Sequence, residues 1–327
     1  MNSFVKLHGS LQALTFAAMK IFHSIESFQN VKNPILTLGM FDGVHIGHQA
    51  IIRQLNEIAS NINGESTLLT FEPHPRVVLG KGADNLQLLT PLEEKIGLLE
   101  TSGLQNLILH PFTREFSNMS AEDFVQKLLV NKIGIHTLVI GYDHHFGKNR
   151  EGNFEQLQKL SGELNFNLIK LDEVKSGDAH ISSTQIRNEL WKENVKFAEK
   201  GLGRHYSISG RVVHGDKLGR TLGFPTANLK LPLYKLIPKD GVYLVKVRLN
   251  NEIYKGLLSI GTRPTVTNSN EKRVEVFILD FEKEIYGENL KLDLIEFIRE
   301  DQKFDSVEEL VKQMNSDKLI AENYSFY

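Results

Sequence analysis

Two histidines three residues apart, His45 and His48, lie in a stretch of the chain that reads GMFDGVHIGH from residue 39. The apolar run 35–38 precedes this stretch and residues 49–60 carry apolar side chains at helical spacing, which predicts a turn between a strand and a helix. Glycines let the backbone approach a ligand closely, and a helix N-terminus attracts anions. Because both histidines can donate to phosphate oxygens, we interpret the turn as a nucleotide site. A glycine-rich turn with two solvated histidines is the alternative.

A second candidate site lies in residues 210–228. Three glycines recur there at intervals of four residues, at Gly215, Gly219 and Gly223. Such a loop can turn backbone amides toward phosphates, although glycines also make ordinary loops. Thr226 and Asn228 follow, two residues apart, and would share one face of a strand from which both present oxygen to a hard cation such as Mg²⁺. An ordinary hydrogen-bonding pair on the surface is the alternative.

The elements that must position the first site alternate between strand and helix. Strand-like runs cover residues 35–38, 66–71, 104–109, 137–140 and 167–171. Thr90, Pro91 and Glu93 predict a capping box for one intervening helix, and Ser120 predicts a cap for another that extends to about residue 132. This alternation predicts an α/β, Rossmann-like domain with a parallel, doubly wound sheet, whose ligands bind at the carboxyl ends of the strands.

Polar loops recur at that expected edge. They lie at residues 72–75, 141–147 and 181–187, the last of which opens a helix. Taken alone, Ser183 and Thr184 would be ordinary N-caps, Arg187 a surface charge and His74 a turn residue. Because all these loops should meet at one edge of the sheet, we expect them to contribute to the first site.

The second half of the chain changes to a β pattern. Strand-like runs cover residues 206–213, 241–249, 252–260, 274–280 and 290–298. Asn250 and Asn251 predict a tight hairpin turn, and Ser306 with Glu309 predicts a capping box for a C-terminal helix. Short strands with one closing helix predict a small antiparallel β-barrel. A helical stretch, residues 184–200, joins the two halves.

Composition sets the outer limits. A chain of 327 residues favours two domains, and we expect a first domain at 1–186, a linker helix at 187–202 and a second domain at 203–327. Lys and Arg total 38 against 40 Asp and Glu, which argues against a nucleic-acid partner. The absence of cysteine excludes disulfides and thiolate catalysis. We expect a cytoplasmic protein with no membrane partner, as a monomer or weak oligomer, and residues 1–30 suggest no function.

The motifs resemble those of known families. In its GxFDGVHxGHQ form the first motif is similar to that of the bacterial bifunctional riboflavin kinase/FAD synthetase family, within the nucleotidyltransferase superfamily. Residues 181–187 match the ISSTxIR motif of that superfamily. Residues 210–228, 241–243, 261–265 and 273–277 resemble the riboflavin kinase family. Together these similarities cover almost the entire chain. The family often has Phe-Arg where this chain has His144-His145.

The resemblance implies two reactions. The C-terminal domain would convert riboflavin and ATP to FMN and ADP, and the N-terminal domain would convert FMN and ATP to FAD and pyrophosphate. ATP would be the co-substrate of both reactions, FMN and FAD the products, and Mg²⁺ the cofactor. The residue types agree with such transfers, which need positioning and charge neutralisation more than bond chemistry by the protein.

The resemblance also implies roles for individual residues. Glu275 would be the base that takes the proton of the ribityl hydroxyl, and His45 and His48 would be catalytic in adenylyl transfer. The nucleotide of adenylyl transfer would contact Gly39, Phe41, Asp42, Gly43, His45, His48, Asp143, Ser183, Thr184 and Arg187. The ATP of the kinase would contact His214, Gly215, Gly219, Gly223 and Thr226, with the metal on Thr226 and Asn228. The flavins would contact His74, Pro75 and Arg299.

Two alternatives remain open. One is an enzyme that retains only one of the two activities, against which the intact His45, His48 and Arg187 speak. The other is a flavin- or nucleotide-binding regulator or carrier without turnover, for which the near-neutral charge and the lack of a basic tail give no support. The flavin redox state, substrate channelling and reversibility of FAD formation are not predicted by the sequence.

Overall fold

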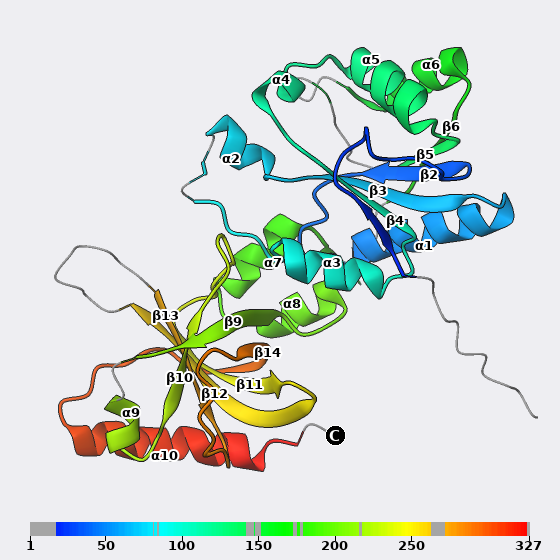
Figure 1. Ribbon diagram of the computed structural model, residues 1–327. Helices are drawn as coiled ribbons and strands as arrows, with labels where there is room; N and C mark the ends of the chain where they lie inside the picture. The colour runs from blue at the N-terminus through cyan, green and yellow to red at the C-terminus, as the bar shows by residue number, and fades with distance from the viewer. Residues whose placement is uncertain are drawn as a thin grey trace, which may run out of the picture.

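A computed structural model shows the chain as a sheet domain joined to a β-barrel by a pair of helices (Figure 1). It describes residues 18–325 except 81, 84, 142–146, 148–151, 173–174, 177–178, 216–217 and 263–271. The predicted site residue Asp143 lies outside the described residues, as does most of the predicted motif 261–265.

The first domain contains a six-stranded parallel sheet. Its order is β1 (Lys20–Phe22), β4 (Asn106–His110), β3 (Glu65–Phe71), β2 (Pro34–Leu38), β5 (Thr137–Ile140) and β6 (Asn167–Lys170). The strand order reverses at β2, which lies between β3 and β5. In such sheets ligands bind at the carboxyl ends of the strands where the order reverses. The predicted parallel sheet is confirmed, and the edge strand β1 was not predicted because its three residues form too short a pattern.

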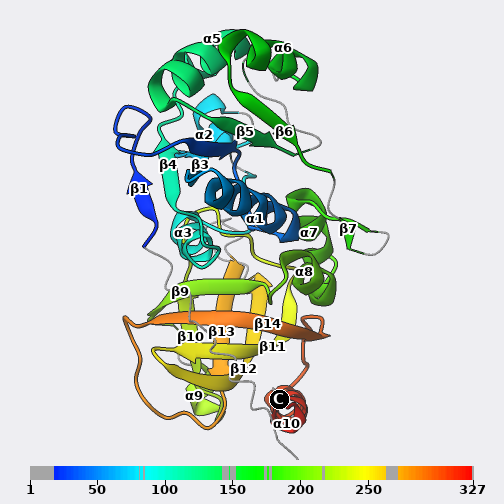
Figure 2. The ribbon, with the colours of Figure 1, turned by 90° about the vertical axis from the view of Figure 1, so that its right-hand side faces the viewer.

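Helices cover both faces of this sheet (Figure 2). The face toward the barrel carries α1 (Ile46–Asn61) and α3 (Leu92–Glu100). The opposite face carries α5 (Ala121–Asp123), its π-helical continuation η1 (Phe124–Ile133) and α6 (Phe154–Leu164). Successive strand residues pack on opposite sides: Ile35 joins the core beneath α1, and Leu36 joins the core beneath η1. The short helices α2 (Pro75–Leu79) and α4 (Arg114–Ser117) lie in loops at the carboxyl edge.

The second domain is a closed antiparallel barrel, as predicted. Its strands follow the order β10 (Thr226–Lys230), β13 (Lys272–Ile278), β12 (Glu252–Thr262), β11 (Gly241–Leu249), β14 (Asn289–Arg299) and β9 (Ser207–Val213). The short helix α9 (Leu218–Thr221) precedes β10. The C-terminal helix α10 (Val307–Asn323) lies along the barrel (Figure 1). The Ser306 hydroxyl caps this helix by accepting from the Glu309 N–H at 3.2 Å, which confirms the predicted cap. Outside both domains' sheets, β7 (Lys175–Ser176) and β8 (Ala179–His180) form a small hairpin.

The predicted single helix over 184–200 is wrong. The segment forms two helices, α7 (Ser183–Leu190) and α8 (Val195–Leu202). Glu193 adopts a positive φ of 65°, and the Asn194 side chain caps α8 by accepting from the Phe197 N–H. Both helices share one hydrophobic core with the barrel, in which Ile186 and Leu202 pack with the barrel residues. The segment between the domains is therefore packed rather than free, while the domain boundaries stay a prediction.

The predicted capping box at Thr90 is also wrong. Helix α3 begins at Leu92 with Pro91 in the N-cap position, and no side chain caps it. The Thr90 hydroxyl instead accepts from the Gly43 N–H at 2.9 Å. A tertiary contact with the first glycine-rich turn thus replaces the local cap.

Candidate active sites

The first glycine-rich turn borders a cavity of about 510 Å³ at the carboxyl edge of the sheet. The ends of β2, β5 and β6 and the N-termini of α1 and α7 line this cavity. Six of the predicted nucleotide residues are in its lining, namely Gly39, Phe41, His45, His48, Ser183 and Thr184. Two helix N-termini therefore meet at one cavity, which favours an anionic ligand. We call it the N-terminal site.

The two histidines are held by the start of α1. The His45 side chain is the N-cap of that helix, and its Nδ1 accepts from the His48 N–H at 3.4 Å. The ring of His48 stacks between His45, at a centroid distance of 3.7 Å, and Phe41, at 4.4 Å. Because Nδ1 of His45 accepts a hydrogen bond, Nε2 of His45 carries the proton of the neutral ring and is a donor.

Burial keeps two histidines of this region neutral. It lowers the pKa of His48 well below the usual value, and the nearby His45 and Lys95 act in the same direction. Burial likewise lowers the pKa of His74 to about 4, although the nearby Asp42 opposes the shift. The Nδ1 atom of His48 is buried without a hydrogen-bond partner among the described residues, so stacking holds the ring.

These shifts predict that acid destabilises the fold. Because the pKa of His74 in the folded state lies below that of an unfolded chain, its contribution to the free energy of unfolding is complete above about pH 6.5 and declines toward pH 4. We expect the melting temperature to fall over this range, and to fall less in His74→Asn, whose side chain can still cap α2. Thermal unfolding of both proteins at several pH values measures this difference. Parallel curves would contradict it.

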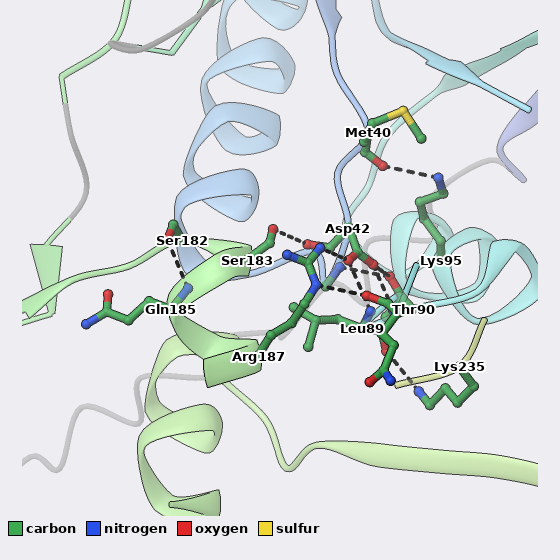
Figure 3. Close-up of polar contacts among 12 residues, drawn as sticks. Met40, Asp42, Leu89, Thr90, Lys95, Ser182, Ser183, Gln185, Arg187 and Lys235 are labelled. Carbon is green, nitrogen blue, oxygen red and sulfur yellow. Dashed lines mark hydrogen bonds and ion pairs between the residues drawn. The ribbon is translucent and has the colours of Figure 1, made fainter. Parts of the chain in front are cut away.

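Asp42 connects the turn to the rest of the domain (Figure 3). Its carboxylate accepts from the N–H groups of Leu89 and Thr90, at 3.0 and 2.9 Å, and from Nη2 of Arg187 at 2.5 Å. The Ser183 hydroxyl donates to the Asp42 carbonyl at 2.8 Å. Asp42 is buried, and neither it, Gly43 nor Arg187 is part of the cavity lining. These three predicted nucleotide residues therefore lie behind the cavity. Asp42 and Gly43 shape the turn there.

Sequence analysis missed a buried cation beside this turn. Lys95 of α3 is 5% exposed, and its Nζ donates to the Met40 carbonyl at 3.1 Å (Figure 3). Burial lowers its pKa, while Asp42 and Glu72 oppose the shift. Its position one helical turn before the buried Leu99 was the available signal, because it places a lysine on the apolar face of α3.

An aromatic cluster at the ends of β3 and β4 was also missed. The Phe71 ring lies 5.5 Å from Phe112 and 5.3 Å from Phe116, and the His110 ring lies 5.0 Å from Phe116. The two predicted flavin residues His74 and Pro75 follow directly, where the His74 Nδ1 caps α2 by accepting from the Arg76 N–H.

The second glycine-rich stretch meets β13 of the barrel. Asn228 lies opposite Glu275 in the sheet register, and the Thr226 hydroxyl donates to Oε2 of Glu275 at 3.1 Å. On its other side, Oε1 of Glu275 lies 3.6 Å from Nη1 of Arg273. Glu275 borders a small cavity of about 230 Å³ together with Asp301. The structure thus brings Thr226, Asn228 and Glu275 together, in what we call the barrel site.

Close approach explains two of the glycines. A Cβ atom on Gly215 would lie 2.2 Å from Nδ2 of Asn228, and one on Gly219 would lie 2.3 Å from the Phe224 carbonyl oxygen. The His214 ring, which precedes this loop, lies 4.0 Å from that of Tyr286. Gly223 adopts a positive φ of 83°. The spacing of the glycines therefore lets the loop pack directly on β10.

We expect Gly215→Ala to impair the barrel site selectively, because the added methyl must displace Asn228. Overpacking of this kind costs about 1–3 kcal/mol. The reaction that the resemblance implies for the barrel, riboflavin phosphorylation, should fall, whereas the reaction implied for the N-terminal site, adenylyl transfer to FMN, should stay unchanged. Gly162→Ala in α6 is the matched control, because a Cβ there meets nothing within 4 Å. Equal rates for Gly215→Ala and Gly162→Ala in the phosphorylation assay would refute this expectation.

The predicted flavin residue Arg299 is not part of the lining of either cavity. Its Nε and Nη2 atoms each lie 2.9 Å from Oδ2 of Asp317, and both side chains are largely buried. The pair ties β14 to α10. A contact of Arg299 with flavin stays a prediction.

Comparison with known proteins assigns the two domains. Residues 27–185 match the family model of FAD synthetase, and residues 202–325 match that of riboflavin kinase. Bifunctional riboflavin kinase/FMN adenylyltransferases are similar over nearly the whole chain. That of Listeria monocytogenes is 40% identical, covering 88% of this chain and 90% of its own length, and that of Escherichia coli is 37% identical, covering 94% and 98%. The chain belongs to this family.

The bifunctional riboflavin kinase/FMN adenylyltransferase family carries both activities predicted from the motifs, and this chain is an enzyme of that kind. A solved structure described as a macrolide-efflux protein from Streptococcus pneumoniae has the same two-domain fold. It is 32% identical, has a TM-score of 0.85 and covers 94% of this chain and 100% of its own. Within the part of the chain that is described, no helix is long and apolar enough to cross a membrane.

Proposed function

We propose that the N-terminal site performs adenylyl transfer and the barrel site performs riboflavin phosphorylation, so that FMN made by one site is the substrate of the other. The observation that carries the proposal is the hydrogen bond between Thr226 and Glu275 in a barrel that is joined to a sheet domain with its own cavity at two helix N-termini. ATP then supplies the γ-phosphate in riboflavin phosphorylation and the AMP group in adenylyl transfer.

In the kinase reaction, the oxygen of the ribityl hydroxyl bonds to the γ-phosphorus of ATP, and Glu275 accepts the proton of that hydroxyl. The bond to the β,γ-bridging oxygen breaks and ADP leaves. The hydrogen bond from Thr226 to Oε2 fixes the carboxylate, and Oε1, which lies 3.6 Å from Nη1 of Arg273, would accept the proton. Glu275 alternates with the buried Val274 and Val276, so its side chain is on the other face of β13.

The donor set of the barrel site suits Mg²⁺. Thr226 and Asn228 offer neutral oxygens and Glu275 a carboxylate, and hard cations prefer oxygen ligands. Among the described residues no group of three or more His, Asp or Glu side chains forms a metal cluster by itself. We therefore propose that Thr226 and Asn228 would hold the metal. The bound ion would neutralise phosphate charge.

In adenylyl transfer, a phosphate oxygen of FMN attacks the α-phosphorus of ATP, the α,β-bridging bond breaks and pyrophosphate leaves. His45 donates through Nε2, and the neutral His48 supplies a further donor without needing a proton from solution. The N-termini of α1 and α7 add backbone donors near Ser183 and Thr184. Arg187 neutralises Asp42, which keeps a buried carboxylate from repelling the phosphates.

The flavin of adenylyl transfer needs an aromatic surface. We assign this role to the cluster of Phe71, Phe112 and Phe116, because ring faces and edges of this kind favour a flat conjugated ligand. His74 and Pro75 follow the same strand end and complete the surface. A cytoplasmic location and a monomeric or weakly associated state are part of the proposal.

A time course of purified protein with riboflavin, ATP and Mg²⁺ tests the proposal. Chromatography should show FMN appearing first and FAD following, while a second reaction started from FMN should yield FAD directly. Omission of Mg²⁺ should stop both. Flavin binding without either product would support the regulator or carrier alternative instead.

A further inference from the structure

Residues 86–90, which we call the bridging segment, lie between the two active-site domains. On one side, the N–H groups of Leu89 and Thr90 donate to Asp42 of the N-terminal site. On the other side, Leu88 forms a parallel β-bridge with Lys235 of the barrel domain. The Leu88 N–H donates to the Tyr234 carbonyl at 2.6 Å, and the Leu236 N–H donates to the Leu88 carbonyl at 2.8 Å. The segment is thus hydrogen-bonded to both domains.

Lys235 holds the bridging segment from the barrel side (Figure 3). Its Nζ donates to the Leu89 carbonyl at 2.8 Å and forms an ion pair with Glu94 of α3 at 2.6 Å. The Lys235 side chain is only 1% exposed, and its Nζ lies 4.6 Å from the centre of the Tyr206 ring. A buried ammonium is costly unless its donors are satisfied, so these contacts define its position closely.

One residue connects Lys235 to Asp42. The Leu89 N–H points to the Asp42 carboxylate, and the Leu89 carbonyl accepts from Lys235. A shift of this residue would remove a donor from Asp42, and the paired Arg187 would move with it. The barrel side also contacts the turn directly, because Nη2 of Arg204 donates to the Gly43 carbonyl at 2.6 Å. The loss of Lys235 alone should therefore loosen the turn without releasing it.

We propose that Lys235, a residue of the kinase domain, is a positioning residue for the adenylyltransferase site, acting through the bridging segment on Asp42 and Arg187. It touches no substrate. The inference deepens the proposed function and rests on it, since it assumes that the N-terminal site makes FAD. It implies that the barrel contributes to FAD formation even when FMN is supplied and the kinase reaction is not needed.

Lys235→Met tests the inference, because methionine fills the same space without a charge or a donor. With the full chain and FMN as substrate, kcat/KM for FAD formation should fall about tenfold to a hundredfold, the range expected when a catalytic group is misplaced by a fraction of an ångström to one ångström. Riboflavin phosphorylation by the same preparation should stay within about twofold of wild type, which shows that the barrel is folded. Equal losses in both reactions, or no loss in FAD formation, would overturn the inference.

Lys239→Met is the matched control. Lys239 lies four residues away and also joins two parts of the chain, through Glu193 and Glu300, yet it is 43% exposed and neither ion pair involves the bridging segment. Both reactions should be unchanged in this variant. A loss of FAD formation equal to that of Lys235→Met would show that any altered lysine here has the effect, and would overturn the inference.

Two double variants test the route. In an Asp42→Asn background, Lys235→Met should lower kcat/KM for FAD formation little further, because the group through which Lys235 acts is already altered. If the two substitutions lowered kcat/KM independently, so that their factors multiplied, that route would be excluded. In Lys235→Met/Glu94→Gln the loss of FAD formation should persist. Recovery of FAD formation in this double variant would mean that the unpaired Glu94 charge had caused the loss, and would overturn the inference. The proposed function fails separately, if wild-type protein makes no FAD from FMN and ATP.

Discussion

Glu275→Gln should abolish FMN formation and leave FAD formation from FMN intact. Glutamine keeps the size and the acceptor oxygen that Thr226 contacts, but it cannot take a proton. Removal of a general base typically lowers kcat by about 10²–10⁴-fold, so we expect a loss in this range for riboflavin phosphorylation. The KM for ATP should change little, because the substituted group does not bind the nucleotide. Separate assays with riboflavin and with FMN measure the two activities.

Glu296→Gln is the matched control for this variant. Glu296 is another glutamate on a barrel strand, β14, and its side chain is exposed. It should phosphorylate riboflavin at the wild-type rate. If Glu275→Gln also phosphorylated riboflavin at that rate, Glu275 would not be the base, and its contacts with Thr226 and Arg273 would be structural.

The two sites differ in how far the sequence predicts them. Strands β5 and β11 have the expected bounds. In the barrel, strand alternation predicted that Thr226 and Asn228 share a face, whereas Glu275 was expected from the resemblance alone. That β10 and β13 are neighbours, which brings the three residues together, is known from the structure.

The surroundings of Asp42 could not be predicted in the same way. Its partners Leu89 and Thr90 are 47 and 48 residues away and donate through backbone N–H groups, which every non-proline residue carries. The same contact explains why the capping box at Thr90 failed, because the Gly43 N–H occupies the hydroxyl that would cap α3. Where two segments meet, a tertiary hydrogen bond can therefore override a capping pattern that is local in the sequence.

Sequence motifs also do not separate groups that contact a ligand from groups that support them. His48 and Arg187 belong to equally distinctive motifs, yet His48 lines the cavity and Arg187 is bound to Asp42 behind it. The structure therefore ranks the residues for mutagenesis. Substitutions at the cavity lining should act on the reaction directly, and those behind it should act through the shape of the turn.

His48→Ala should abolish FAD formation and leave FMN formation intact, so that FMN accumulates from riboflavin and ATP. The change removes a ring that stacks on both Phe41 and His45, and it removes a neutral donor from the cavity lining. Loss of one preorganised donor costs about 10²–10³-fold in kcat. Chromatography of the flavins over time measures both steps in one reaction.

His23→Ala is the control for His48→Ala, because His23 is an exposed histidine of the same domain. His48→Gln separates chemistry from packing, since its amide can donate a hydrogen bond but cannot stack as an imidazole does. Partial recovery of FAD formation in His48→Gln would identify donation as the main role. Full activity of His48→Ala would mean that His45 and the helix N-termini suffice, and the proposed role of His48 would be wrong. Because His48 is already neutral in the folded protein, the wild-type rate of FAD formation should not require its protonation at neutral pH.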